Sequence, residues 1–141
     1  MRVINYFSER PKEREVITVG NRASIYIRTN IEQHELEGEE PHTEWVAVEY
    51  STTVNANGFK LTDAFVEKLI QYETDMAALN VRITRNALLD RSDKEMAVDR
   101  IESEDPQYVD AWKAYRQALR DITKQGGFPF NVEWPIEPKK A

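Results

Sequence analysis

The sequence predicts an α+β fold: N-terminal antiparallel strands, then a long helix, a short helix and a C-terminal helix that leads into an extended proline- and aromatic-rich tail. Short β-branched runs with alternating apolar residues lie within residues 1–58. From residue 62 the apolar residues step alternately by four and three positions, the spacing of a packed helix face. Pro129, Pro135 and Pro138 exclude a helix at the C-terminal end.

Length and composition predict one folded domain over residues 1–141, with a β part over 1–58 and a helical part over 62–141. A chain of 141 residues fits one ordinary core, and a hydrophobic fraction of 40% is too high for a disordered chain. The formal net charge of -6 works against binding to phosphate backbones or anionic lipids. We therefore expect neither nucleic acid nor membrane as a partner.

The absence of cysteine and the charged N-terminal stretch also exclude classes of protein. With no cysteine in the sequence, disulfides, thiolate metal sites and cysteine nucleophiles are excluded. Residues 1–14 contain no apolar run long enough for a signal peptide or a membrane span. We expect the protein to stay in the cell that makes it.

Three strands are predicted in the first 58 residues. Val16–Val19 is a short β-branched run, and Trp45–Tyr50 is dense in apolar and β-branched residues. Between them, the stretch from Ala23 to Ile31 alternates. The apolar face of this middle strand is expected to contain Ala23, Ile25, Ile27 and Ile31. The acidic stretch from Glu32 to Thr43 has loop composition, so the strands on either side of it are expected to pair antiparallel.

A long helix is predicted from Thr62 to Arg91. Thr62 is a suitable N-cap and Asp63 suits the helix dipole, and neither Gly nor Pro interrupts the chain before Asp90. A seam of apolar residues follows the helix: Phe65, Leu69, Tyr72, Met76, Leu79 and Ile83. This seam is either a coiled-coil interface between subunits or the intramolecular face that meets the C-terminal helix.

Two further helices are predicted after the long one. Ser92–Glu95 has the form of a capping box and predicts a short helix over Lys94–Ile101. Pro106 suits the first turn of the last helix, which Gly126–Gly127 is expected to end. The apolar seam of that helix contains Tyr108, Trp112, Tyr115, Leu119 and Ile122. We expect the two long seams to pack together.

The sequence offers little for catalysis. His34 and His42, with Glu35, Glu37 and Glu39 between them, could suggest a divalent metal site, but their spacing matches no defined metal loop. Acidic loop residues of this kind are usually solvated. The sequence also lacks a Gly-x-Ser-x-Gly elbow and a phosphate-binding glycine loop. We therefore expect no enzyme activity, no cofactor and no metal.

The C-terminal end is unusually apolar for an extended segment. Its apolar side chains are Phe128, Pro129, Phe130, Val132, Trp134 and Ile136. Either Trp134 and its neighbours fold back on the helix of Trp112 and Tyr115 as part of the core, or they hold another protein in an extended groove. In the first case Arg116 and Arg120 would pair with Asp121, or with carbonyl groups where the segment leaves the helix.

These residues resemble the C-terminal signature of bacteriophage tail assembly chaperone and tail-fibre assembly proteins. In that signature an aromatic helix ends in Tyr-Arg-Gln-x-Leu-Arg-Asp, and a Gln-Gly turn, Phe-Pro and Trp-Pro follow. An Arg-x-x-x-Leu-x-x-x-Asp element precedes it. The matching residues here are Arg85, Leu89, Asp93, Trp112, Tyr115, Arg116, Leu119, Arg120, Asp121, Phe128, Pro129, Trp134 and Pro135. The family often has a Trp after the first aspartate, where this chain has Lys94.

The resemblance implies a non-enzymatic protein that helps tail or tail-fibre subunits fold or assemble in the cytoplasm of the bacterial host. Its partner would be a phage tail or tail-fibre protein. An alternative is a small structural component or adaptor of the phage tail itself. A homo-oligomer through the Phe65–Ile83 seam is a further possibility for the long helix.

Overall fold

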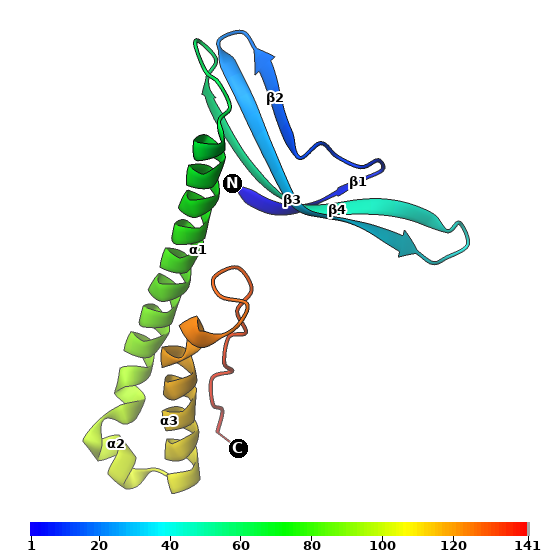
Figure 1. Cartoon of the computed structure of the whole chain (residues 1–141). Coiled ribbons are helices and arrows are strands. Elements are labelled where there is room, and N and C mark those ends of the chain that lie inside the picture. The colour runs from blue at the N-terminus through cyan, green and yellow to red at the C-terminus, as the bar shows by residue number, and fades with distance from the viewer. Residues whose placement is uncertain (141) are drawn as a thin grey trace. The chain divides into compact units, whose positions relative to one another are not determined.

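The computed structural model describes residues 1–140, and the chain divides into two compact units, Met1–Glu73 and Thr74–Ala141. The boundary lies inside helix α1 (Asp63–Ser92), whose first turns belong to the N-terminal unit and whose remainder belongs to the C-terminal unit. Strands precede helices along the chain (Figure 1), so the predicted α+β class is confirmed.

The N-terminal unit contains a four-stranded antiparallel sheet. Its strands are β1 (Arg2–Phe7), β2 (Arg14–Val19), β3 (Arg22–Leu36) and β4 (His42–Asn55), in the spatial order β1-β4-β3-β2. The predicted antiparallel pairing around the acidic stretch is confirmed by β3 and β4. Strand β1 was not predicted, because its apolar residues lie on both faces, with Ile4 and Tyr6 exposed, so the alternation that marks a strand is missing.

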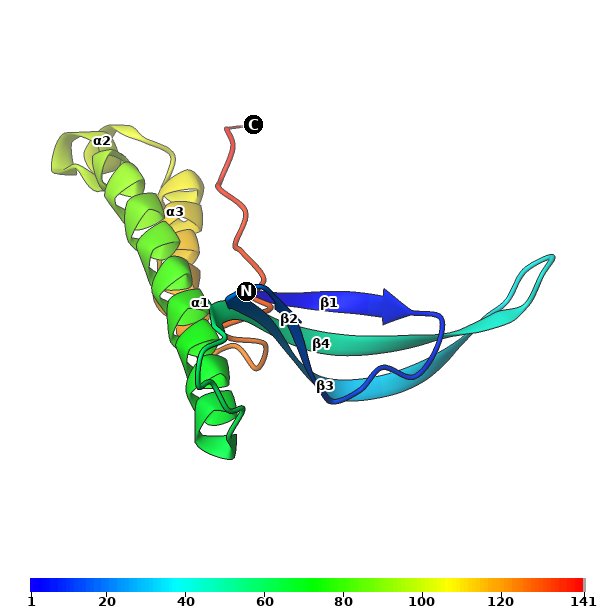
Figure 2. The ribbon, with the colours of Figure 1, turned by 90° about the horizontal axis from the view of Figure 1, so that it is seen from above.

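The loop predicted over Glu32–Thr43 is wrong for most of its length. Strand β3 continues to Leu36 and β4 begins at His42, and the two strands run side by side to their hairpin turn (Figure 2). Side chains on both faces of this extension are largely exposed, so the sequence shows no alternation there. A register shift follows Thr29, where Asn30 has a φ of 51°, and it takes Ile31 out of the buried row.

One face of the sheet packs against the first turns of α1. Ile25 and Ile27 of the predicted apolar face are buried together with Tyr50 of β4. Val66 and Leu69 of α1 complete this cluster. The predicted inward face of β3 is therefore confirmed through Ile27, and it forms the core of the N-terminal unit.

Helix α1 begins as predicted. The Thr62 hydroxyl accepts a hydrogen bond from the backbone N–H of Phe65 at 3.2 Å, and Asp63 lies in the first turn. The helix has 30 residues and is therefore about 45 Å long.

The seam predicted along α1 does not meet the C-terminal helix. Beyond Leu69 its members Tyr72, Met76, Leu79 and Ile83 are exposed. In the C-terminal unit α1 instead buries Ala78 and Val81, and it packs Leu88 and Leu89 against the last helix. The prediction of an intramolecular seam is wrong because the four-and-three spacing does not reveal that small residues form a second buried face.

The short helical region after α1 differs from the prediction. It consists of the 3₁₀ turn η1 (Asp93–Met96) and the helix α2 (Val98–Ser103), separated by Ala97 in an extended conformation. Ser92 is the last residue of α1, and its hydroxyl donates to the Leu89 carbonyl at 2.7 Å. The prediction of a capping box is therefore wrong. The Ser92 hydroxyl binds a carbonyl group at the end of α1 and does not cap the helical turn that follows.

Helix α3 (Pro106–Arg120) begins as predicted and ends earlier. Pro106 occupies the first turn, and the Asp105 carboxylate caps the helix by accepting from the Gln107 backbone N–H at 2.9 Å. The helix ends at Arg120, before the 3₁₀ turn η2 (Ile122–Lys124). Gly126–Gly127 therefore does not stop it, because the chain has already turned at Asp121.

Candidate functional site

The candidate site is formed by the end of α1, by α3 and by the C-terminal arm, defined here as residues 128–140. Its centre is an aromatic cluster in which Trp112 and Tyr115 are each 5% exposed and Leu119 is fully buried. The Trp112 ring makes edge-to-face contacts with Tyr108 and Tyr115, with centroids 6.2 and 5.5 Å apart. The partly buried side chains Leu88, Leu89, Met96 and Tyr108 surround it.

Packing, rather than a hydrogen bond, holds the Trp112 ring in this cluster. The Trp112 indole N–H has no acceptor among residues 1–140. The predicted buried face of α3 is confirmed by Trp112, Tyr115, Leu119 and Ile122.

Arg116 ties α3 to the end of α1. Its Nη1 atom donates to the Leu89 carbonyl at 3.1 Å, to the Asp93 carboxylate at 2.7 Å and to the Ser92 hydroxyl. The last carbonyl groups of a helix lack intrahelical partners, so the guanidinium satisfies one of them while it pairs with a carboxylate. The structure therefore brings together Leu89, Asp93 and Arg116 from two separate parts of the predicted signature.

The pairing predicted for Asp121 is wrong. Its carboxylate accepts from the Gln117 amide at 3.0 Å and from the Lys124 ammonium at 2.6 Å, not from Arg116. The Gln117 hydrogen bond and then Lys124 lower the pKa of Asp121. Arg120 is exposed, and Arg85 donates only to the neighbouring Asn86 side chain, at 3.0 Å. The structure does not bring these two arginines to the Trp112 cluster.

A tight turn sends the C-terminal arm back. The Asn131 backbone N–H donates to the Gly127 carbonyl at 2.7 Å. A side chain at position 127 would bring its Cβ within 1.9 Å of the Asn131 carbonyl oxygen, so only glycine fits. At position 126 a Cβ would meet nothing within 4 Å.

The Gln125 side chain then holds the arm by binding both backbone groups of one residue, as a neighbouring β-strand would. Its Nε2 donates to the Glu133 carbonyl at 2.8 Å, and its Oε1 accepts from the Glu133 backbone N–H at 2.7 Å. Sequence reasoning included Gln125 in the Gln-Gly turn of the signature but did not predict this role.

Beyond Glu133 the arm runs back alongside α3 (Figure 1), attached mainly by charged groups. Arg91 of α1 pairs with Glu137, and Lys140 pairs with Glu104 at 2.9 Å and lies over the Tyr108 ring. The Lys140 ammonium lowers the pKa of Glu104. Burial, and secondarily the Glu137 charge, raises the pKa of Tyr115.

The apolar side chains of the arm are not part of the core. Trp134 is 37% exposed and Ile136 87% exposed, and Phe130 also faces solvent. Of the two alternatives for the arm, the one in which Trp134 folds back into the core of Trp112 and Tyr115 is therefore wrong. The arm folds back and polar contacts hold it, while Phe130, Trp134 and Ile136 stay accessible.

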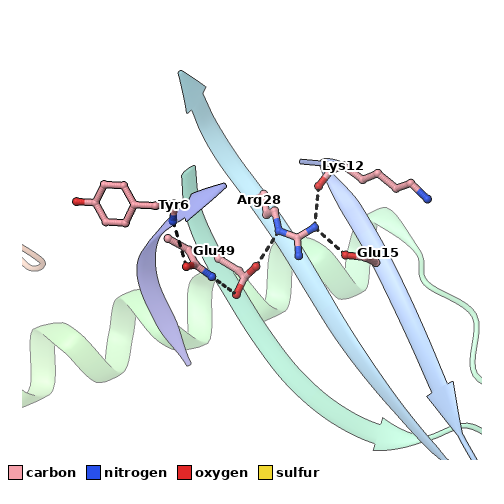
Figure 3. Close-up of polar contacts among 6 residues, drawn as sticks. Tyr6, Lys12, Glu15, Arg28 and Glu49 are labelled. Atoms are coloured by element: carbon pink, nitrogen blue, oxygen red, sulfur yellow. Dashed lines mark hydrogen bonds and ion pairs between the residues drawn. The ribbon is translucent and has the colours of Figure 1, made fainter. Parts of the chain in front are cut away.

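A buried charge network in the N-terminal unit was missed by sequence reasoning. Arg28 donates to the Glu49 carboxylate at 2.7 Å, to the Glu15 carboxylate at 2.9 Å and to the Lys12 carbonyl at 3.1 Å (Figure 3). Arg28 and Glu49 are direct neighbours across β3 and β4, and both side chains are more than 90% buried. Burial alone would lower the pKa of Arg28, but the two carboxylates outweigh it and raise that pKa.

This network is structural. It lies beneath the connection between the edge strands β1 and β2, which crosses the second face of the sheet. The signal in the sequence was the single charged residue in each of the two predicted strands, Ala23–Ile31 and Trp45–Tyr50, at positions that pair once the hairpin register is known.

The acidic stretch and its histidines stay at the surface. His34 lies 3.4 Å from the Glu32 carboxylate, and His42 lies 3.2 Å from the Glu40 carbonyl. Among residues 1–140 no group of three or more His, Asp or Glu side chains is arranged to hold a metal ion. Over the same residues, no helix has the length and apolar character needed to cross a membrane.

Comparison with known proteins assigns a family to this site. Residues 78–139 match the family model described as phage tail assembly chaperone protein. The matched segment begins in the second half of α1 and includes α3, the Gln125 contacts and nearly all of the C-terminal arm. No curated protein and no solved structure matches the chain.

Proposed function

We propose that this chain, whose residues 78–139 match the phage tail assembly chaperone family, is a non-enzymatic member of that family that helps phage tail subunits fold or assemble. The clients in this proposal are tail or tail-fibre proteins, and the place of action is the cytoplasm of the infected bacterium. The single observation that carries the proposal is the family match, which coincides with the compact C-terminal unit.

The design of that unit supports a binding role. In this proposal the buried and paired signature residues hold the module, and the C-terminal arm meets the client. Trp134 and Ile136 are accessible, and between them the backbone is extended. An extended segment with open backbone groups and alternate apolar side chains can add to the edge of a partner's sheet or lie in its groove.

The signature residues fall into two proposed roles. Those assigned to holding the module are Leu89, Asp93, Trp112, Tyr115, Arg116, Leu119, Asp121, Phe128 and Pro129. Trp134 and Pro135 are assigned to client binding, and the half-buried Arg85 and the exposed Arg120 could add charge to the same surface.

The alternative is that the chain is a small structural component or adaptor of the tail. Quantitative mass spectrometry of purified virions separates the two, with an infected-cell lysate as the reference. A chaperone is present in the lysate and depleted from virions relative to tail proteins. Recovery from virions at a stoichiometric ratio to a tail subunit would favour the structural component and overturn the proposal.

A second copy of the chain is a further proposed partner, through a coiled coil along the seam from Phe65 to Ile83. The members of this seam from Tyr72 onward are exposed, which supports an intermolecular contact.

A further inference from the structure

The extended part of the C-terminal arm has two backbone edges, and one of them is held by the rest of the unit. In an extended chain, the N–H and C=O groups of successive residues point to opposite sides, so alternate residues share an edge. Gln125 binds both backbone groups of Glu133, at 2.8 Å from the carbonyl oxygen and 2.7 Å from the amide nitrogen. The edge that contains Glu133 therefore faces Gln125.

The other edge, here called the open edge, has no partner. It contains the N–H and C=O groups of Val132, Trp134 and Ile136, and none of these groups forms a hydrogen bond within residues 1–140. The side chain of Val132 is half-buried, whereas Trp134 is 37% exposed and Ile136 87% exposed. Both the polar and the apolar groups of this edge are therefore accessible.

The prolines of the arm agree with this division. Trp134 precedes Pro135 and Glu137 precedes Pro138, and a residue before proline is restricted to extended conformations. Pro135 has no N–H, but by the alternation it shares the edge of Glu133. The missing donor therefore leaves the open edge uninterrupted over residues 132–136.

We infer that the client adds a β-strand to the open edge, with Gln125 holding the arm extended beforehand. A row of backbone donors and acceptors is complementary to the edge of a partner's sheet. A client that covered the arm through side chains alone would bury these N–H and C=O groups without partners, which is costly. The inference rests on the client binding proposed above and names the mode of contact.

The side chains of the arm define the chemistry of the client strand. Val132, Trp134 and Ile136 lie on one face of the extended segment, and Glu133 and Glu137 lie on the other. Glu137 already pairs with an arginine of α1, whereas Glu133 forms no ion pair within residues 1–140. Because cross-strand neighbours interact, the client strand should be apolar on the first face and carry Lys or Arg opposite Glu133.

Gln125 should raise the affinity for the client without touching it. An arm that is already extended loses less conformational entropy when the client binds. Gln125→Ala should therefore weaken capture of a tail subunit by the full chain about tenfold. Gln117→Ala is the matched control, because the Gln117 amide binds Asp121 and not the arm. Equal capture by the Gln125 variant and the unchanged chain would overturn the inference.

Backbone methylation separates strand pairing from side-chain binding. A semisynthetic full-length chain with an N-methyl group on the Ile136 amide loses one donor of the open edge and keeps every side chain. Its affinity for the tail subunit that the tagged chain retains from infected cells should fall about tenfold. The same change at Glu137, on the other edge, is the control and should change the affinity less than about twofold. An unchanged affinity after methylation of Ile136 would overturn the inference.

Amide hydrogen exchange follows the open edge without any substitution. In the free chain the Glu133 amide should be protected, and the amides of Trp134 and Ile136 should exchange rapidly. Binding of the same tail subunit should slow exchange at both of these amides. Rapid exchange that persists in a complex would overturn the inference and leave the proposed function standing. Retention of no tail subunit would overturn both, so the two failures are distinguishable.

Discussion

Each unit of this chain contains a largely buried arginine, and the two arginines differ in the exposure of the carboxylate that they pair with. In the sheet, Arg28 is enclosed between strands and pairs with the buried Glu49, so its charge is part of a core. In the C-terminal unit, the Arg116 side chain is also largely buried, at 14% exposed, but the carboxylate that it pairs with, Asp93, is 63% exposed. The charge contacts of the arm are exposed in the same way. Exposed ion pairs contribute little to stability, so we expect a fixed sheet and an arm that can be released at low cost.

The largest expected effect tests the fixed half of this comparison. Arg28→Ala should lower the free energy of unfolding by about 3–5 kcal/mol, because it leaves the Glu49 carboxylate buried without its partner. The double variant R28M/E49L should lose much less, since no unpaired charge remains. Urea denaturation measures both. Equal losses in the two variants would mean that side-chain packing, not charge pairing, sets the cost.

The aromatic cluster and the arm should respond differently to the same substitution. Trp112→Ala should cost about 3–5 kcal/mol, because a buried ring is replaced by a cavity. Trp134→Ala should cost less than about 1 kcal/mol, because that side chain is 37% exposed and outside the cluster. Thermal and urea unfolding provide the comparison. Similar losses would mean that the arm is part of the core after all.

Glycine substitutions test the tight turn at residues 126–131, which directs the arm back along α3. Gly127→Ala should destabilise the turn by about 1–3 kcal/mol, because its Cβ would overlap the Asn131 carbonyl oxygen. Gly126→Ala is the matched control and should be nearly neutral. Amide hydrogen exchange at Asn131 and Glu133 reports the turn directly. Unchanged protection at both amides in the Gly127 variant would contradict the geometry described here.

The smallest effect concerns pH. Lys140 lowers the pKa of Glu104 below its ordinary value of 4.5. A lowered folded-state pKa means that the contact stabilises the arm above the unfolded pKa and is lost as pH falls through the folded one. The Glu104–Lys140 contact, and with it the attachment of the arm, should therefore weaken only below about pH 4.5. Trp134 fluorescence, followed against pH, measures release of the arm. The control variant Glu104→Gln should lack this transition.

The sequence predicted best where a local signal sets the structure. Thr62 and Pro106 start helices through their own side-chain or ring geometry, and β3 buries Ile25 and Ile27 through simple alternation. Prediction failed where a distant residue decides. The Ser92 hydroxyl is bound by Arg116, 24 positions away, which no capping rule can anticipate. The single domain expected from the length stays a prediction.

The candidate site was only half predictable for the same reason. The signature located α3 and the arm, and the buried face of α3 followed from helical spacing. The exposed position of Trp134 depends on the Gln125 contacts and on ion pairs near the C-terminal end of the arm, which spacing does not reveal. Both faces of α1 are apolar, and only the structure shows which one is buried.

Co-purification from infected cells tests the central claim most directly. A tagged full-length chain should retain a phage tail or tail-fibre subunit, identified by mass spectrometry. The triple variant F130S/W134S/I136S should retain much less of that subunit while it unfolds at nearly the same urea concentration. Loss of capture without loss of stability is the result that our account predicts. Capture of no tail protein by the intact chain would contradict it.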